Sequence, residues 1–295
     1  MKQTLQLYPH ETYLPTDTQL PKSGPIPYPL TNDYMFRAVI QKDPESAKHL
    51  IAALLNLDPK RILDFKILNP IILGDHIDEK DCILDIRLLL NDNTKINLEM
   101  QVDHLENWTS RSIYYLSRMF TDLKKGDNYK HALPSLHIGI LTKSLFPEEP
   151  RFYSKNYLSD IETHHLYSGI FGIHVLDLSQ INNVTDEERN SPLYDWACLF
   201  HATTWEEVNI MAEKSDAIHS CANYLKELTE DEKIKLRCEA RARYYADKES
   251  AVETGRVSTL RLYQRLKEQG RLDELDRCEY EPELFQKLLE EFHLL

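Results

Sequence analysis

Two neighbouring segments in the first half of the chain, residues 82–90 and 95–101, have the composition of β-strands. In the second segment, apolar and polar residues alternate, which is the period of a strand with one face toward a core. Glu99 and Gln101 therefore lie side by side on the polar face. The alternating apolar residues are Ile96, Leu98 and Met100.

Asp85 interrupts an otherwise apolar run in the first of these segments. An unpaired buried carboxylate costs on the order of several kcal/mol, so Asp85 needs a partner or a metal ion. A three-residue loop at 92–94 would pair residue 91 with residue 95, which places Asp85 opposite Gln101 and diagonal to Glu99. Two carboxylates and an amide oxygen in this arrangement can hold Mg²⁺ or another hard divalent cation. A two-residue loop would turn Asp85 to the wrong face unless a bulge corrected it.

Less specific interpretations of the same residues stay open. Backbone donors or Arg87 could satisfy Asp85 without a metal, and Glu99 and Gln101 could form the solvated face of an amphipathic strand. His164, His165 and His174 suggest zinc, but no cysteine or carboxylate at ligand spacing accompanies them, which favours structural roles.

Composition excludes several classes of protein. The chain has 295 residues, a formal net charge of −13 and 8 glycines, and it contains neither GxxxxGK[ST] nor GxGxxG. A P-loop ATPase, a Rossmann dehydrogenase and a protein that coats nucleic acid through its overall charge are therefore disfavoured. The 5 cysteines form no CxxC pair, and no apolar run approaches the roughly 20 residues of a membrane span. With no signal peptide in view, we expect a reduced, soluble, cytoplasmic protein without membrane contact.

The distribution of residue types divides the chain into three regions. Residues 1–29 are rich in proline and are expected to form an extended arm. Residues 30–180 alternate helix and strand patterns. Residues 181–295 are predicted to be a helical C-terminal region, whose amphipathic segments suit a homodimer. The fold class is thus α/β with a helical C-terminal region. Asn32 or Asp33 is expected to cap a helix that carries Met35, Phe36, Val39 and Ile40. Asp43, followed by Pro44 in the first turn, is expected to cap a second helix that runs to about residue 56. Further predicted helices are 105–124, 192–202, 205–213, 216–228, 231–249, 256–268 and 282–292, and predicted strands include 62–68, 136–141 and 170–178.

Four motifs occur in a fixed order along the first 115 residues: Asn32-Asp33-Tyr34-Met35-Phe36, Asp85, Glu99-Met100-Gln101, and Trp108-Thr109-Ser110-Arg111-Ser112-Ile113-Tyr114-Tyr115. In this order they resemble the PD-(D/E)XK nuclease superfamily, in particular its branch of Rpn family recombination-promoting nucleases and putative transposases. The resemblance covers about residues 30–180. It implies a restriction-endonuclease-like core, in which helices flank a central mixed sheet, and a Mg²⁺-dependent endodeoxyribonuclease that acts on DNA.

The resemblance also implies roles for individual residues. Asp85 and Glu99 correspond to the metal-binding acids, and Gln101 stands where the superfamily has a catalytic lysine. Gln101 carries no positive charge, so it could orient water but could not replace the lysine electrostatically. Asp33 is implied to lie near the metal. Arg111 could contact the phosphate, and Tyr115 shares a helix face with it.

Two other functions remain open. The chain could be a catalytically weak or inactive nuclease-fold protein that acts in DNA binding or protein assembly, which its acidity and Gln101 favour. Alternatively, the substrate could be RNA or another phosphodiester, although no RNA-binding motif is present.

Overall fold

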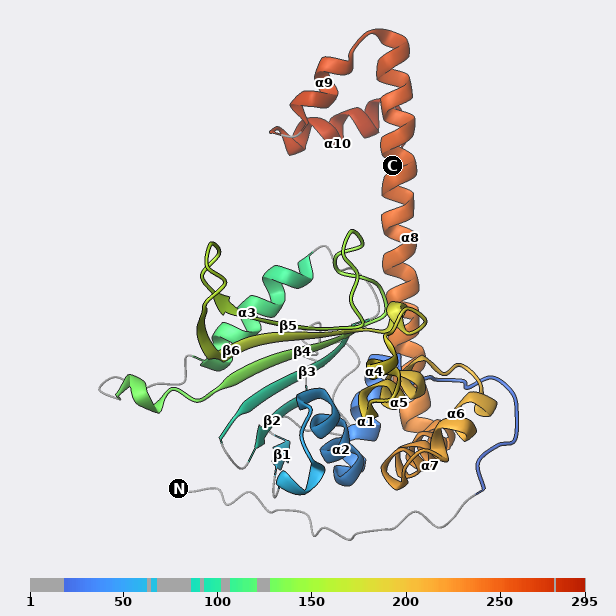
Figure 1. Ribbon diagram of the computed structural model, residues 1–295. Helices are drawn as coiled ribbons and strands as arrows, with labels where there is room; N and C mark the ends of the chain where they lie inside the picture. Colours follow the sequence, from blue (N-terminus) through green and yellow to red (C-terminus); the bar gives the residue numbers. More distant parts are fainter. Residues whose placement is uncertain are drawn as a thin grey trace, which may run out of the picture. The chain divides into compact units, whose positions relative to one another are not determined.

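A computed structural model describes residues 19–62, 65–67, 86–90, 93–101, 107–120, 128–278 and 280–294. The chain forms two compact units, which divide between Glu239 and Ala240. The first contains a mixed sheet with the strand order β1-β2-β3-β4-β6-β5 and helices on both faces (Figure 1), as the predicted fold class requires. The strands are β1 (Phe65–Ile67), β2 (Ile86–Leu90), β3 (Lys95–Gln101), β4 (Ser135–Leu141), β5 (Tyr153–Ser159) and β6 (Leu166–Asp177).

The register of β2 and β3 decides which side chains share a face. The two strands are antiparallel, and Leu89 pairs with Lys95. The prediction that residue 91 pairs with residue 95 was therefore wrong by two positions. Asn93 takes a left-handed backbone conformation (φ 64°), and the Leu90 amide donates to the Thr94 carbonyl (2.9 Å), so the contact between the two segments extends to Leu90 and Thr94. A shift of two residues preserves the face of every side chain.

Helices α1 (Asp33–Lys42) and α2 (Pro44–Leu55) lie against one face of the sheet (Figure 1). Local signals set their ends, as expected. The Asn32 side chain accepts hydrogen bonds from the first turn of α1, and Asp43 caps α2 with Pro44 as its first residue. Helix α2 ends at Asn56 in the left-handed conformation. The other face of the sheet is covered by α3 (Trp108–Phe120).

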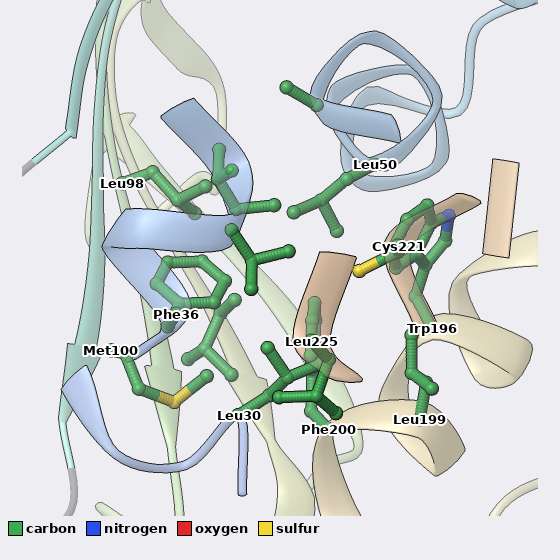
Figure 2. Packing of buried hydrophobic residues seen from close by; sticks show 14 of the residues in the cluster. Leu30, Phe36, Leu50, Leu98, Met100, Trp196, Leu199, Phe200, Cys221 and Leu225 are labelled. Atoms are coloured by element: carbon green, nitrogen blue, oxygen red, sulfur yellow. The ribbon is translucent and has the colours of Figure 1, made fainter. Parts of the chain in front are cut away.

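The main core lies between the sheet and the helices on the α1 side (Figure 2). Phe36 of α1 packs among side chains of β3 and of the later helices, and its ring meets that of Phe200 edge to face, with centroids 5.6 Å apart. This cluster includes Leu98 and Met100, so the apolar face of β3 points into it, as the alternation predicts. The helices that complete this unit are α4 (Asp186–Arg189), α5 (Pro192–His201), α6 (Trp205–Ala212) and α7 (Asp216–Glu230).

The described part of the N-terminal arm, from residue 19, follows an irregular path against α6. Pro25 forms a bridge with Thr204, and the Ile26 amide donates to the Thr203 carbonyl (2.8 Å). Ile26 is buried in the core cluster. The arm thus packs on the body in its described part, while its first 18 residues lie outside the described structure.

The helices of the C-terminal region differ from the predicted ones in two respects. The short helices at residues 186–189 and 272–277 were not predicted. Helix α8 (Glu232–Gln269) is continuous where two helices, 231–249 and 256–268, were predicted. It contributes to both units. In the second unit, the end of α8 packs with α9 (Leu272–Arg277) and α10 (Pro282–Glu291) around a small core of Leu262, Leu266, Leu288 and Leu289. In the described part of the chain, no helix has the length and apolarity to cross a membrane.

Candidate active site on the polar face of β3

The polar face of β3 is buried beneath α3. Asn97, Glu99 and Gln101 are exposed to only 1%, 7% and 7%. The interpretation of this face as a solvated strand surface was therefore wrong, because α3 covers it. A buried carboxylate and two buried amides at alternate positions of one strand need polar partners within the protein or from a ligand.

Arg111 of α3 supplies one such partner. Its Nη2 atom donates to Glu99 Oε1 (2.7 Å) and to Gln101 Oε1 (2.6 Å). The Arg111 side chain is about one-third exposed, whereas that of Glu99 is nearly buried. A carboxylate oxygen and an amide oxygen thus converge on a single cationic nitrogen. Asp103 and Glu106, two acidic residues near Arg111 in the sequence, lie outside the described residues.

His137 of β4 is a second partner, which the sequence did not reveal. β3 and β4 run parallel, and Asn97 pairs with His137 in their register. His137 is fully buried, with its Nδ1 atom 3.0 Å from Asn97 Nδ2 and its Nε2 atom 3.3 Å from Glu99 Oε2. The contact with Glu99 is close but lacks the alignment of a hydrogen bond, since both atoms remain without a hydrogen-bond partner. The polar cluster therefore extends across two strands.

Trp108 and Gly139 set the distance between α3 and the sheet. The Trp108 indole ring lies against Gly139 so closely that a Cβ there would overlap the ring atom Cζ2. The Trp108 ring also lies 5.6 Å from that of His137, and the Tyr115 ring lies 6.2 Å from His137 (centroid distances). Tyr115, predicted to share the Arg111 face, thus borders the cluster. The bare backbone at Gly139 is what allows α3 to bring Arg111 to Glu99.

The cluster contains a concentration of buried polar atoms without hydrogen-bond partners. Buried polar groups in proteins are almost always hydrogen-bonded, so several such atoms in one place mark a site that water or a ligand completes. Among the described residues, the atoms of this kind in the cluster are Asn97 Oδ1, Glu99 Oε2, Trp108 Nε1, Arg111 Nε and His137 Nε2.

The remaining predicted site residues are Asp85 and Asp33. Asp85 lies outside the described residues, one position before Ile86, which pairs with Leu98. Asp33 is buried in the first turn of α1. Burial and, to a lesser extent, the charge of Asp33 raise the pKa of Cys238 to about 12. Their roles stay predictions. Among the described residues, no three or more His, Cys, Asp and Glu side chains form a cluster suited to a metal. Asp85 is not one of the described residues.

His174, considered in the sequence with His164 and His165, lies on the other face of the sheet. Its Nδ1 is 2.8 Å from the Tyr153 hydroxyl, and its Nε2 is 2.8 Å from that of Tyr157. Tyr153 in turn donates to the Leu54 carbonyl (2.6 Å). Burial and, to a lesser extent, Lys155 lower the pKa of His174 to about 4. His174 is thus a neutral, hydrogen-bonded core residue.

The mixed sheet with helices on both faces, and a β3 strand that carries Glu99 and Gln101 directly after β2, define the class of PD-(D/E)XK nuclease folds. The sequence model of one family, described as PD-(D/E)XK nuclease family transposase, matches residues 30–255. The chain belongs to this family, as the motif order predicts. No curated protein and no solved structure matches the chain.

Proposed function

We propose that this chain is a metal-dependent DNA endonuclease that hydrolyses phosphodiester bonds, with a role related to the movement or recombination of DNA. The observation that carries the proposal is the convergence of Glu99 Oε1 and Gln101 Oε1 on one atom, Nη2 of Arg111. The Glu99 oxygen that would bind a cation and the Gln101 amide that would orient water thus face the same point. The family to which the chain belongs supports nuclease chemistry and DNA as its substrate.

The chemistry of the donor set fits a hard divalent cation such as Mg²⁺. Carboxylate and amide oxygens are the ligands that this ion prefers. Glu99 Oε2 is buried and has no hydrogen-bond partner in the described structure, so it can accept a hydrogen bond while Oε1 would take the cation. Asp85, adjacent in sequence to the residue that pairs with Leu98, would be the second acid. When bound, such an ion supplies charge stabilisation at the phosphate and acidifies water.

The chain's own residues have distinct roles in this proposal. Asp85 and Glu99 hold the cation. Gln101 presents an uncharged amide that orients the attacking water through hydrogen bonds. Arg111, once its hold on Glu99 is released, can place its guanidinium on the phosphate, because its side chain is partly exposed. Asp33 and Tyr115 are accessory.

A second function is favoured by the same contact. Arg111 neutralises Glu99 without any metal, and Gln101 lacks the charge of the superfamily's lysine. A chain with these features could retain the nuclease fold and act in DNA binding or assembly. In either case, we propose a cytoplasmic protein that forms a homodimer through its C-terminal helices. The dimer would allow both strands of a duplex to be cut.

Cleavage of supercoiled plasmid DNA tests the proposed activity. The wild-type chain should nick or cut the plasmid with Mg²⁺ or Mn²⁺ and not with EDTA, and Asp85→Ala and Glu99→Ala should each abolish cleavage. Glu149→Ala is the matched control, because Glu149 is an exposed acid paired with Arg151 away from the cluster. Undiminished cleavage in both site variants would contradict the proposal. A parallel assay with single-stranded RNA separates a DNA-specific enzyme from a general phosphodiesterase.

A further inference from the structure

His137 is the most deeply buried polar side chain in contact with Glu99. Its exposure is 0%, and it stands on β4, whereas Glu99 stands on β3. The pairing of Asn97 with His137 in the parallel register brings the two residues together, and the Asn97 amide holds one side of the imidazole ring (3.0 Å). Asn97, which has no other role in the proposed site, therefore holds the imidazole ring of His137 in place.

The contacts among Asn97, His137 and Glu99 determine which ring nitrogen of His137 carries the proton. When the amide nitrogen of Asn97 donates to His137 Nδ1, the ring proton is on Nε2. That atom lies 3.3 Å from Glu99 Oε2, and neither atom has a hydrogen-bond partner. A donor and an acceptor thus face each other, slightly too far apart and misaligned, while Arg111 holds the other oxygen, Oε1.

We infer that His137 is a positioning residue for Glu99. Its Nε2–H donates to Oε2 once Arg111 releases Oε1, which fixes the carboxylate with Oε1 turned toward the cation. Residues behind metal ligands act in this way, since a hydrogen bond to one oxygen orients the other and makes it a better ligand. The inference rests on the proposed function, because it assigns His137 a role at the same metal site.

A matched pair of substitutions tests this role. The amide nitrogen of glutamine reaches the position of His137 Nε2, whereas that of asparagine reaches only the position of Nδ1. His137→Gln therefore keeps the donor to Glu99, and His137→Asn removes it while the site stays polar. Titration calorimetry with Mn²⁺ on the full chain should give a dissociation constant for His137→Gln close to that of the wild type. For His137→Asn, we expect affinity weakened by about 10- to 100-fold.

The outcomes separate the role of His137 from the proposed function itself. If the wild type binds no Mn²⁺, the metal site is wrong, and the role of His137 fails with it. If the wild type binds and His137→Asn binds equally well, only the role of His137 is wrong. Equal weakening in both variants would also overturn it, because it would show that ring packing matters rather than the Nε2 donor. Thermal unfolding of each variant without metal confirms that the titrated protein is folded.

Discussion

Arg111 and Glu99 form an ion pair beneath α3, in which Nη2 lies 2.7 Å from Oε1. The same nitrogen donates to Gln101, so one guanidinium occupies the point where the Glu99 oxygen proposed to bind the cation meets the amide oxygen of Gln101. In the structure, Arg111 therefore supplies the positive charge that Glu99 needs. A divalent cation would have to compete with it, and this competition gives the first prediction.

Arg111→Met should strengthen metal binding and weaken catalysis. Removal of the competing charge is expected to lower the dissociation constant for Mn²⁺ by about tenfold, which corresponds to roughly 1.4 kcal/mol. Without metal, the variant should lose about 1–3 kcal/mol of stability, because Glu99 is left buried without its partner. Calorimetry and urea unfolding measure the two effects, and plasmid cleavage should fall. Arg151→Met, at an exposed arginine, is the control. Weaker Mn²⁺ binding in Arg111→Met would show that Arg111 assists the site rather than competes for it.

Gly139→Ala should destabilise the first unit. The added Cβ would overlap the Trp108 ring, and an overpacked core costs about 1–3 kcal/mol. Gly169→Ala on β6 is the matched control, since its Cβ would meet only a leucine methyl group at 3.9 Å, and it should leave stability nearly unchanged. Urea unfolding monitored by tryptophan fluorescence compares the two. Equal stabilities would mean that α3 does not approach the sheet as closely as described.

His174 should make the protein less stable in acid. Its folded pKa of about 4 is below the usual value of 6.5, so between these pH values the unfolded chain binds a proton that the folded chain does not. The free energy of unfolding therefore falls as pH drops from about 6.5 to about 4, by on the order of 2–3 kcal/mol from this group. His174→Gln should be less stable at neutral pH and flatten this dependence. His164→Gln, at an exposed histidine, should keep the wild-type slope. Parallel slopes in all three proteins would contradict the assignment.

Gly255→Ala should stabilise the second unit. Gly255 lies within the continuous helix α8, and a Cβ there meets no atom within 4 Å. Glycine within a helix costs about 1 kcal/mol relative to alanine, so the variant should gain roughly that amount. Thermal unfolding followed by circular dichroism at 222 nm provides the measurement. A loss of stability would indicate that the helix is interrupted near Gly255, as expected if residues 231–249 and 256–268 formed two separate helices.

Local signals made much of the fold predictable. Asn32, Asp43 and Pro44 determine helix starts through contacts within one turn, so α1 and α2 begin as predicted. The period-two pattern of residues 95–101 reproduces β3. Strand β5 could not be assigned in the same way. It is an edge strand, largely exposed, whose pairing with β6 includes a register shift near Leu158, and neither property leaves a clear pattern in the sequence.

The site was predictable only in part for a similar reason. Glu99 and Gln101 are on one strand, so their common face follows from alternation. His137 joins them only because β3 and β4 pair in parallel across 40 positions, which no local pattern encodes. A usable signal was nevertheless present, since His137 is a polar residue within the otherwise apolar segment 136–141. The predicted boundaries at residues 30 and 180 stay predictions, whereas the compact units divide between Glu239 and Ala240.

Titration of Mn²⁺ into the wild-type chain and into Glu99→Gln, followed by calorimetry, tests whether Glu99 binds a divalent cation. Glutamine keeps the size of Glu99 and can still accept from Arg111, but it lacks the charge that holds a divalent cation. We expect saturable binding in the wild type and a loss of at least about tenfold in affinity in Glu99→Gln, as is typical of the loss of a charged ligand. Wild-type protein that binds no Mn²⁺, or Glu99→Gln that binds it equally well, would contradict the claim and favour a nuclease fold without metal-dependent activity.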